Sequence, residues 1–252
     1  YVGTTTQTGY SQNVTIKDVR LDNNHRQGIS VISVQNMLID NAVILNTNGT
    51  APEAGIDFEV NYNTQRIFNV QVRNSVIYAN HTWGILFAGH ADLVDGPITV
   101  DIENVTILGN HADGIRMYHP LPGVTIKDSL VVGNDGYGFR GTPVTSDLVQ
   151  GEISGEGPPR NSIDTSVLWD NASGGRTGWT RLGAGAFTNV EPIFHSLDPD
   201  DPYFLYLDLS NPAVILHGGH DGGYLGARPV YVPEPSSAWG LLLLGGMMLH
   251  RK

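Results

Sequence analysis

The sequence predicts an all-β protein built as a parallel β-helix, a solenoid in which each turn of the chain is one coil. Two observations predict it: glycines that recur every 24 to 30 residues, and short runs of alternating apolar and polar residues with no sustained helical period. Alternation with a period of two is the signature of a strand, and equivalent positions of stacked coils lie about 4.8 Å apart. The 31 glycines and only 15% charged residues are also typical of many short strands joined by tight turns.

Four segments of the chain align with one another without a gap. Each contains an apolar residue, Asp or Asn two positions later, an apolar residue three positions after that, and then Asn-x-x-x-Gly followed by Ile or Phe. These segments are residues 14–31, 70–87, 100–117 and 124–141. A further copy at 37–58 aligns if four extra residues lie between Thr47 and Gly55, and a weaker copy is 163–171. We therefore expect about six coils.

The asparagine of the repeat has a structural role in this prediction. Asn24, Asn80, Asn110 and Asn134 are expected to stack as a side-chain ladder at a bend, each amide donating to the next carbonyl. Asparagine tolerates the left-handed backbone that a tight corner needs, and the glycine four residues later has no Cβ to clash there. Loss of Asn110 should therefore lower stability before it lowers any activity.

Strand alternation predicts which residues after each repeat glycine face outward. The first and third residues are the apolar pairs Ile29/Val31, Ile56/Phe58, Ile85/Phe87 and Ile115/Met117, which form the inward layer. The second residues are Ser30, Asp57, Leu86, Arg116 and Arg140, and the fourth are Ile32, Glu59, Ala88, Tyr118 and Thr142. We therefore expect Asp57 and Glu59 to point to solvent from one strand.

The corner before this strand adds a second set of polar and aromatic residues. His25, His81, His111 and Asp135 follow the ladder asparagines, and Gln27, Trp83, Asp113 and Tyr137 precede the glycines. A long face with aromatic platforms and hydrogen-bonding groups suits a polysaccharide, whose rings stack and whose hydroxyls need directional partners. The candidate substrate-binding residues are Glu53, His81, Trp83, Asp113, Tyr118, Tyr137 and Arg140.

The candidate catalytic residues are Asp57, Glu59, His111 and Arg116, and three interpretations of them stay open. Carboxylates at positions i and i+2 of a strand can reach the separation of roughly 5–9 Å that glycosidases use, with one acting as acid and the other as base. β-Elimination on a uronic acid would instead use an arginine, a histidine or Tyr118. In the third interpretation the carboxylates only solubilise a sheet, so the sequence leaves open whether the protein is an enzyme.

Metal binding has weaker support. "HGGHDGG" at 217–223 brings together His217, His220 and Asp221, without a fourth ligand in view. "SLDPDDPYFL" at 196–205 offers carboxylates for Ca²⁺, but Asp-Pro pairs also simply make turns. No cofactor is certain, and Ca²⁺ is the ion that Asp57, Glu59 or Asp113 would hold. The formal net charge of −11 argues against nucleic acid as a partner.

The chain is expected to divide into three parts. Residues 1–160 form the repeat domain, and an opening without Met suggests that its beginning is truncated. Residues 161–231 form the last coil and a Pro- and Gly-rich cap, of which 189–229 would plug the open end of the solenoid. Residues 232–252 contain an apolar run, Ala238 to Leu249, which as a helix would span about 18 Å and contact a membrane without crossing it.

The last 21 residues, "VPEPSSAWGLLLLGGMMLHRK", resemble the PEP-CTERM sorting signal. The motif maps onto Pro233, Glu234 and Pro235, followed by the apolar run and a basic end. The resemblance implies an exported protein of a Gram-negative-type bacterium that an exosortase-type enzyme processes, with transient inner-membrane contact and a final place in the cell envelope or on the cell surface. Its departures are a short apolar run and a reduced basic end.

The body, residues 13–229, resembles the pectate-lyase-like superfamily of right-handed parallel β-helices. The resemblance is carried by the Asn-x-x-x-Gly-Ile coils and by a tail of the form "EPIF…DPYFLYL…SNPAVILHGG…GYLGA". It implies the right-handed fold, but that superfamily includes lyases, hydrolases, epimerases and non-catalytic surface proteins. The Asn-Thr-Asp, Gly-His-Gly and Arg-Ile-Lys signatures of polygalacturonases and the Asp-Pro-His motif of alginate epimerases are missing, so no catalytic residue is carried over.

Overall fold

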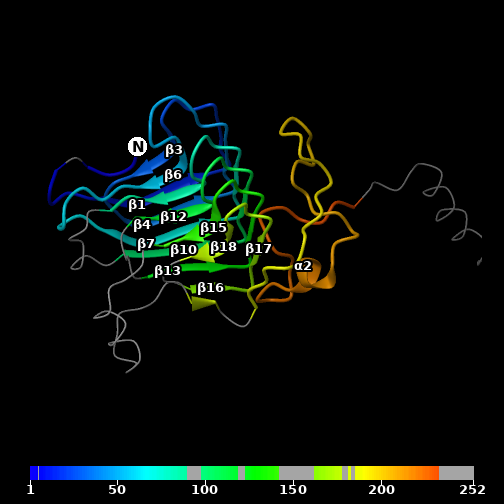
Figure 1. Cartoon of the computed structure of the whole chain (residues 1–252). Coiled ribbons are helices and arrows are strands. Elements are labelled where there is room, and N and C mark those ends of the chain that lie inside the picture. The colour runs from blue at the N-terminus through cyan, green and yellow to red at the C-terminus, as the bar shows by residue number, and fades with distance from the viewer. Residues whose placement is uncertain are drawn as a thin grey trace, which may run out of the picture.

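The chain winds into a solenoid of three parallel sheets, and each coil contributes one strand to each sheet (Figure 1). This computed structural model describes residues 1–4, 6–89, 98–118, 123–141, 162–177, 181–182 and 185–232. The first coil is β1 (Ser11–Lys17), β2 (Arg20–Asp22) and β3 (Gln27–Val31), and every later coil repeats this order. The all-β solenoid of about six coils is thus confirmed.

The first sheet has seven described strands and the other two have six each. After β1, the first sheet contains β4 (Val34–Asp40), β7 (Ile67–Arg73), β10 (Ile98–Glu103), β13 (Val124–Lys127), β16 (Ser162–Asp164) and β19 (Arg181–Leu182). After β2, the second contains β5 (Val43–Leu45), β8 (Val76–Tyr78), β11 (Thr106–Leu108), β14 (Leu130–Val132) and β17 (Val167–Trp169). After β3, the third contains β6 (Ala54–Phe58), β9 (Ile85–Phe87), β12 (Ile115–Met117), β15 (Tyr137–Arg140) and β18 (Gly174–Thr177).

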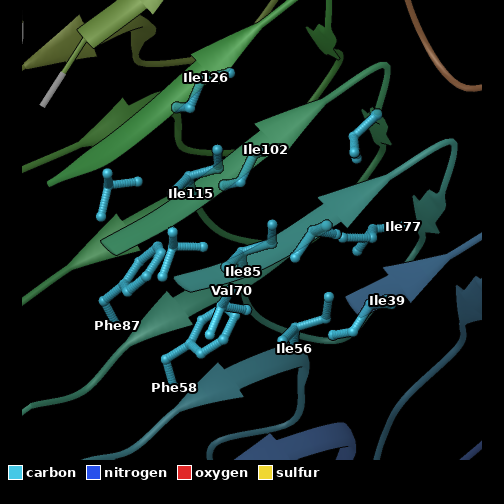
Figure 2. Packing of buried hydrophobic residues seen from close by; sticks show 14 of the residues in the cluster. Ile39, Ile56, Phe58, Val70, Ile77, Ile85, Phe87, Ile102, Ile115 and Ile126 are labelled. Carbon is cyan, nitrogen blue, oxygen red and sulfur yellow. The ribbon is translucent and has the colours of Figure 1, made fainter. Parts of the chain in front are cut away.

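The interior is filled by stacked columns of apolar side chains, as Figure 2 shows. Ile56, Ile85 and Ile115 lie in register on neighbouring strands of the third sheet and are fully buried. The rings of Phe58 and Phe87 stack at 4.9 Å with an interplanar angle of 15°. Full burial of each such side chain stabilises the fold by roughly 1.5–3 kcal/mol, so the columns hold the register of the coils.

The asparagine ladder is confirmed for part of its predicted length. Asn80, Asn110 and Asn134 each donate Nδ2–H to Oδ1 of the next member, at 2.9, 2.9 and 2.7 Å, and the last acceptor is Asn171 of the sixth coil. Asn24 does not belong to the ladder, because Thr47 takes the ladder position in the second coil and its side chain has no amide. The Asn24 amide instead donates to the carbonyls of Gln27 and Gly28.

The left-handed backbone lies one residue earlier than predicted. Asn46 and Ala79, which precede the ladder positions of their coils, have φ values of 55° and 51°. The repeat glycine is required for another reason, close packing against the ladder: a Cβ on Gly84 would lie 2.6 Å from the carbonyl oxygen of Gly114 and 3.0 Å from Nδ2 of Asn110. A side chain there would push the ladder apart.

Six charged residues at the end of the first-sheet strands alternate in sign from coil to coil. They are Lys17, Asp40, Arg73, Glu103, Lys127 and Asp164. Lys17 Nζ lies 3.3 Å from Asp40 Oδ2, and Lys127 Nζ lies 3.0 Å from Glu103 Oε1. Burial alone would raise the pKa of Asp40, but a hydrogen bond from Asn74 and the nearby cations outweigh it and lower that pKa. If each strand paired with the strand two coils away, like charges would lie opposite each other. The row therefore favours the observed pairing between neighbouring coils.

The C-terminal region covers the outer face of the second sheet. Leu130, Val132 and Val167 of that sheet form one buried cluster with Leu207, Ile215 and Leu225, and Val76 forms another with Phe204, Leu205 and Ala227. Ile215 belongs to the short helix α2 (Ala213–His217), which lies beside the solenoid in Figure 1. The prediction that residues 189–229 plug the open end is therefore wrong: the second sheet has apolar side chains on its outer face too, and these need a cover.

Polar contacts fix the same region against several coils. Gly226 N–H donates to the carbonyl of Asp128 at 2.8 Å, and Ala227 N–H donates to Thr106 Oγ1 at 2.9 Å. The predicted sorting motif and apolar helix, residues 233–252, lie outside the described residues. Within the part of the chain that is described, no helix is long and apolar enough to cross a membrane.

Candidate functional site

The two longest connections of the solenoid, 88–97 and 141–161, both leave the third sheet. Residues 59–66, 88–97, 118–123 and 141–161 link strands of the third sheet to the next coil, whereas only two residues, such as Asp18–Val19, link the first sheet to the second. Long connections on a rigid scaffold are the usual place for binding and catalytic groups. The unequal spacing of the repeats, 24 to 30 residues between successive glycines, is the sequence signal for these connections.

The predicted outward column on the third sheet is confirmed by the strand register. Asp57 pairs with Ser30 and Leu86, and Arg116 pairs with Leu86 and Arg140. Asp57 and Arg116 are therefore two strands apart, with Leu86 between them, which is about 9.6 Å along the axis. The column thus divides into a part around Asp57 and a part around Arg116.

Asp57 faces outward by register, but the prediction that it is exposed to solvent is wrong. Only 1% of its surface is accessible. Oδ2 accepts a hydrogen bond from Gln27 Nε2 at 3.0 Å, while Oδ1 is buried and has no hydrogen-bond partner among the described residues. Burial, and to a lesser extent the nearby carboxylate of Glu59, raises the pKa of Asp57 from 3.8 to about 6.

The two neighbouring carboxylates differ in their surroundings. Glu59, half-buried directly after β6, donates its backbone N–H to the carbonyl of Val31. The Glu53 carboxylate turns toward the corner: Oε1 accepts the Gly49 N–H at 2.7 Å, and Oε2 lies 3.7 Å from His81 Nε2. Glu53 therefore joins the corner histidines, while Glu59 stays near Asp57.

The second part of the site consists of Arg116 and the aromatic rings of Trp83 and Tyr118, which we call the arginine–aromatic cluster. The Trp83 and Tyr118 rings meet edge to face at 5.7 Å, and the Arg116 guanidinium lies 4.7 Å from the centre of the Tyr118 ring. Arg116 Nη1 is 3.9 Å from Oδ2 of the buried Asp113, whose Oδ1 accepts the Tyr137 N–H at 2.8 Å. Asp113 thus ties Arg116 to the next coil, and an arginine stacked on a ring keeps its donors directed outward.

The remaining candidates extend this surface along the axis. Arg140, exposed on the strand beside Arg116, lies 5.7 Å from the centre of the Tyr137 ring. At the corner, the His81 and His111 rings are 6.0 Å apart, and His111 Nδ1 is 3.2 Å from Asp135 Oδ2. Both histidines are exposed, and each lies two residues before a residue of this surface, His81 before Trp83 and His111 before Asp113.

One sequence family matches this architecture. Its profile, described as right handed beta helix region, covers residues 5–142, which is more than half of the chain. The chain belongs to the right-handed β-helix family. No curated protein matches the sequence.

The right-handed β-helix offers no evident metal centre in its described part, where no three His, Asp or Glu side chains are placed to hold an ion. In the "HGGHDGG" segment, His217 ends α2, and the His220 backbone N–H donates to Asp128 Oδ1 at 2.9 Å. In the acidic segment, Asp198 and Asp201 accept backbone N–H groups two residues ahead of them. The Asp198 and Asp201 side chains therefore close turns, which is the alternative that the sequence left open for this segment.

Two residues that influence Asp57 were not among the predicted site residues of this right-handed β-helix. Gln27 supplies the hydrogen bond to Oδ2, and Arg26 lowers the Asp57 pKa slightly while its Nε donates to the carbonyl of Ala51 in the insertion. Both lie one coil before Asp57. Their effect on Asp57 follows from the strand register, because Gln27 on β3 pairs with Ala54, the first residue of the strand that carries Asp57.

Proposed function

We propose that this right-handed β-helix is an exported protein that binds a polysaccharide along the outer face of its third sheet. The observation that supports this most is the contact of Trp83, Tyr118 and Arg116, which combines two aromatic rings with a guanidinium on a partly exposed surface. Sugar rings present C–H groups to aromatic faces and hydroxyls to charged and amide groups. A few directed polar groups among aromatic side chains are typical of ligand sites.

The repeat favours a polymer over a small ligand. Tyr137 and Arg140 continue the cluster on the next coil, and coils follow one another at about 4.8 Å. A linear glycan that lies along the axis would meet a similar set of groups at each coil. His81 and His111 at the corner would contribute hydrogen bonds at the edge of the same surface.

Glycan cleavage is a second candidate, and one observation favours it. A carboxyl with a pKa of about 6, as for Asp57, keeps its proton closer to neutrality than an ordinary aspartate, and Glu59 stands two residues away as a base. Because Asp57 is buried, this mechanism requires a rearrangement that opens Oδ1 to the substrate. β-Elimination would use Arg116 and His111 instead.

The burial of Asp57 favours the non-catalytic alternative, in which a cell-surface or matrix protein uses the same face for adhesion. Export and envelope sorting rest on the resemblance of residues 232–252 to a PEP-CTERM signal, and a place in the pectate-lyase-like superfamily rests on the repeat. Sorting predicts a mature chain shortened near Pro233–Pro235 in cells with an exosortase-type enzyme. Intact-mass measurement of the mature chain, with and without that enzyme, tests this.

Binding to immobilised neutral and uronic polysaccharides tests the main proposal. Trp83→Ala and Tyr118→Ala are each expected to weaken binding about tenfold, as loss of a stacked ring and its buried area would. Phe68→Ala is the matched control, because Phe68 is a comparably exposed aromatic residue on β7 of the first sheet. Equal binding by all four proteins would overturn the proposed surface.

The same glycans separate binding from cleavage. Reducing ends without an unsaturated product, lost in Asp57→Asn or Glu59→Gln, would support hydrolysis with these residues as the acid and base. An unsaturated, ultraviolet-absorbing product would support elimination at Arg116. Binding without any product would support the adhesion alternative.

A further inference from the structure

Exposed aliphatic side chains are concentrated in one segment of the described chain. Ten large hydrophobic residues are exposed among the described residues, and five of them lie between positions 193 and 232. These five are Ile193, Leu197, Tyr203, Leu209 and Val232, with exposures of 42, 55, 37, 59 and 70%. We call them the cap patch. Outside the patch, every exposed large hydrophobic residue of the described chain is aromatic, so aliphatic exposure is specific to this region.

The local backbone explains why these residues point outward. Phe194 and Leu207 pair as an antiparallel bridge and pack inward against the second sheet, and Leu207 forms a further bridge with Val230. Ile193, next to Phe194 in sequence, therefore faces away from the solenoid. The patch belongs to the segment that covers the second sheet, whereas the candidate glycan-binding residues lie on the third sheet.

Contacts between aromatic rings hold the segments that carry the patch against one another. The His195 ring stacks on the Tyr231 ring at 3.7 Å and 22°, and Tyr203 meets Tyr231 at 4.7 Å and Tyr206 at 5.6 Å. Tyr231 N–H also donates to the carbonyl of Leu207 at 2.7 Å. The chain is therefore held to the body up to Tyr231, immediately before Val232 of the patch.

The short linker after Val232 limits the distance between that end of the patch and the apolar run. Residues 233–237 connect Val232 to the apolar run at 238–249, and five extended residues reach at most about 18 Å. Wherever the apolar run contacts a bilayer, Val232 at the edge of the patch is kept within about that distance of it. This step rests on the membrane contact proposed for residues 232–252.

We propose that the cap patch is a bilayer-contacting surface that works together with the apolar run in the full chain, before sorting shortens it. Aliphatic and tyrosine side chains partition into the interface between headgroups and acyl chains, and anchoring by a weak segment becomes stable when a second signal is added. Asp198, Asp200, Asp201 and Asp208 border the patch, so the preferred lipids are zwitterionic. In this orientation the third sheet remains free to meet a glycan.

The test uses the full chain and phosphatidylcholine vesicles. Since the chain has no cysteine, Leu197→Cys and Phe68→Cys each provide a single site for an environment-sensitive dye. We expect a blue shift on vesicle addition, and quenching by a lipid-borne quencher, at position 197 and not at position 68. Leu197→Ser with Leu209→Ser should lower vesicle partitioning about tenfold relative to Phe68→Ser.

Each other outcome overturns the proposal in a distinguishable way. Co-sedimentation with vesicles but no dye response at position 197 would leave the membrane contact of the tail and remove the patch. No co-sedimentation would remove both. A dye response to polysaccharide and not to vesicles would make the patch a glycan site. None of these results bears on glycan binding at Trp83 and Tyr118, which the Phe68→Ala comparison measures separately.

Discussion

The second coil of the solenoid differs from the three coils that follow it, although all four have the same repeat. Coils three to five continue the asparagine ladder and carry the arginine–aromatic cluster on their outer face. The second coil has Thr47 in the ladder position, four extra residues between Thr47 and Gly55, and a buried Asp57. Two of the three buried side-chain polar atoms without partners among the described residues, Thr47 Oγ1 and Asp57 Oδ1, belong to it.

The comparison separates coils three to five, which keep the stabilising repeat, from the second coil, which departs from it. Buried polar atoms without partners cost free energy, and such costs are expected chiefly at functional sites. Asp113 provides the contrast: it is also a buried carboxylate on this face, but Arg116 and the Tyr137 N–H satisfy it. The second coil thus departs from the stabilising pattern of the repeat, and coils three to five retain it.

The largest effect is expected from cutting the ladder in the later coils. Asn110→Ala would remove the Oδ1 that accepts both the Nδ2–H and the backbone N–H of Asn80, at about 1–3 kcal/mol for each buried donor, while Asn134 Oδ1 would keep only the backbone N–H of residue 110. We expect the free energy of unfolding in urea to fall by about 3–4 kcal/mol. Asn24→Ala, outside the ladder, should cost at most about 1 kcal/mol. Equal losses would mean that the ladder adds nothing.

In the second coil, replacing a polar side chain should instead raise the free energy of unfolding, because the Asp57 carboxylate destabilises the folded state when it is charged. The pKa of Asp57 is raised on folding from 3.8 to about 6, so its contribution is fully present below pH 3.8 and is lost as the pH rises through about 6. Relative to wild type, Asp57→Asn should therefore gain up to about 3 kcal/mol in unfolding free energy between about pH 4 and about pH 8.

Asp113→Asn is the matched variant for this measurement. It should lose unfolding free energy at about pH 8, because the charge that faces Arg116 is removed while the oxygen that accepts the Tyr137 N–H is kept. Parallel pH profiles for wild type and Asp57→Asn would contradict the account of Asp57.

The smallest effect is expected from restoring the repeat in the second coil. Thr47→Asn would place an amide between Asn24 and Asn80 and remove the unpartnered Oγ1. We expect the unfolding free energy to rise by about 1 kcal/mol, the net value of a typical hydrogen bond. Asn46→Thr at the neighbouring left-handed position (φ 55°) should lower it instead. A loss in Thr47→Asn would show that the insertion shapes the corner so that an amide cannot fit.

Most of the fold and part of the candidate site could be predicted from the sequence. The inward columns, such as Ile56 and Phe58, follow from a period of two and a repeat, because both are local properties of the chain. The outward column of Asp57, Leu86 and Arg116 follows in the same way. The burial of Asp57 could not be predicted, since it depends on what other segments place over the sheet.

By itself the sequence determined a stack of about six coils, their register and the side of the third sheet on which each candidate residue lies. These properties depend on residue spacing, which is encoded within each coil. Only the tertiary structure decided that Asp57 is buried with a raised pKa, that Asp113 holds Arg116 against Tyr118, and that the C-terminal region covers the second sheet. These depend on contacts between residues far apart in the chain, where packing and desolvation, rather than periodicity, fix the outcome.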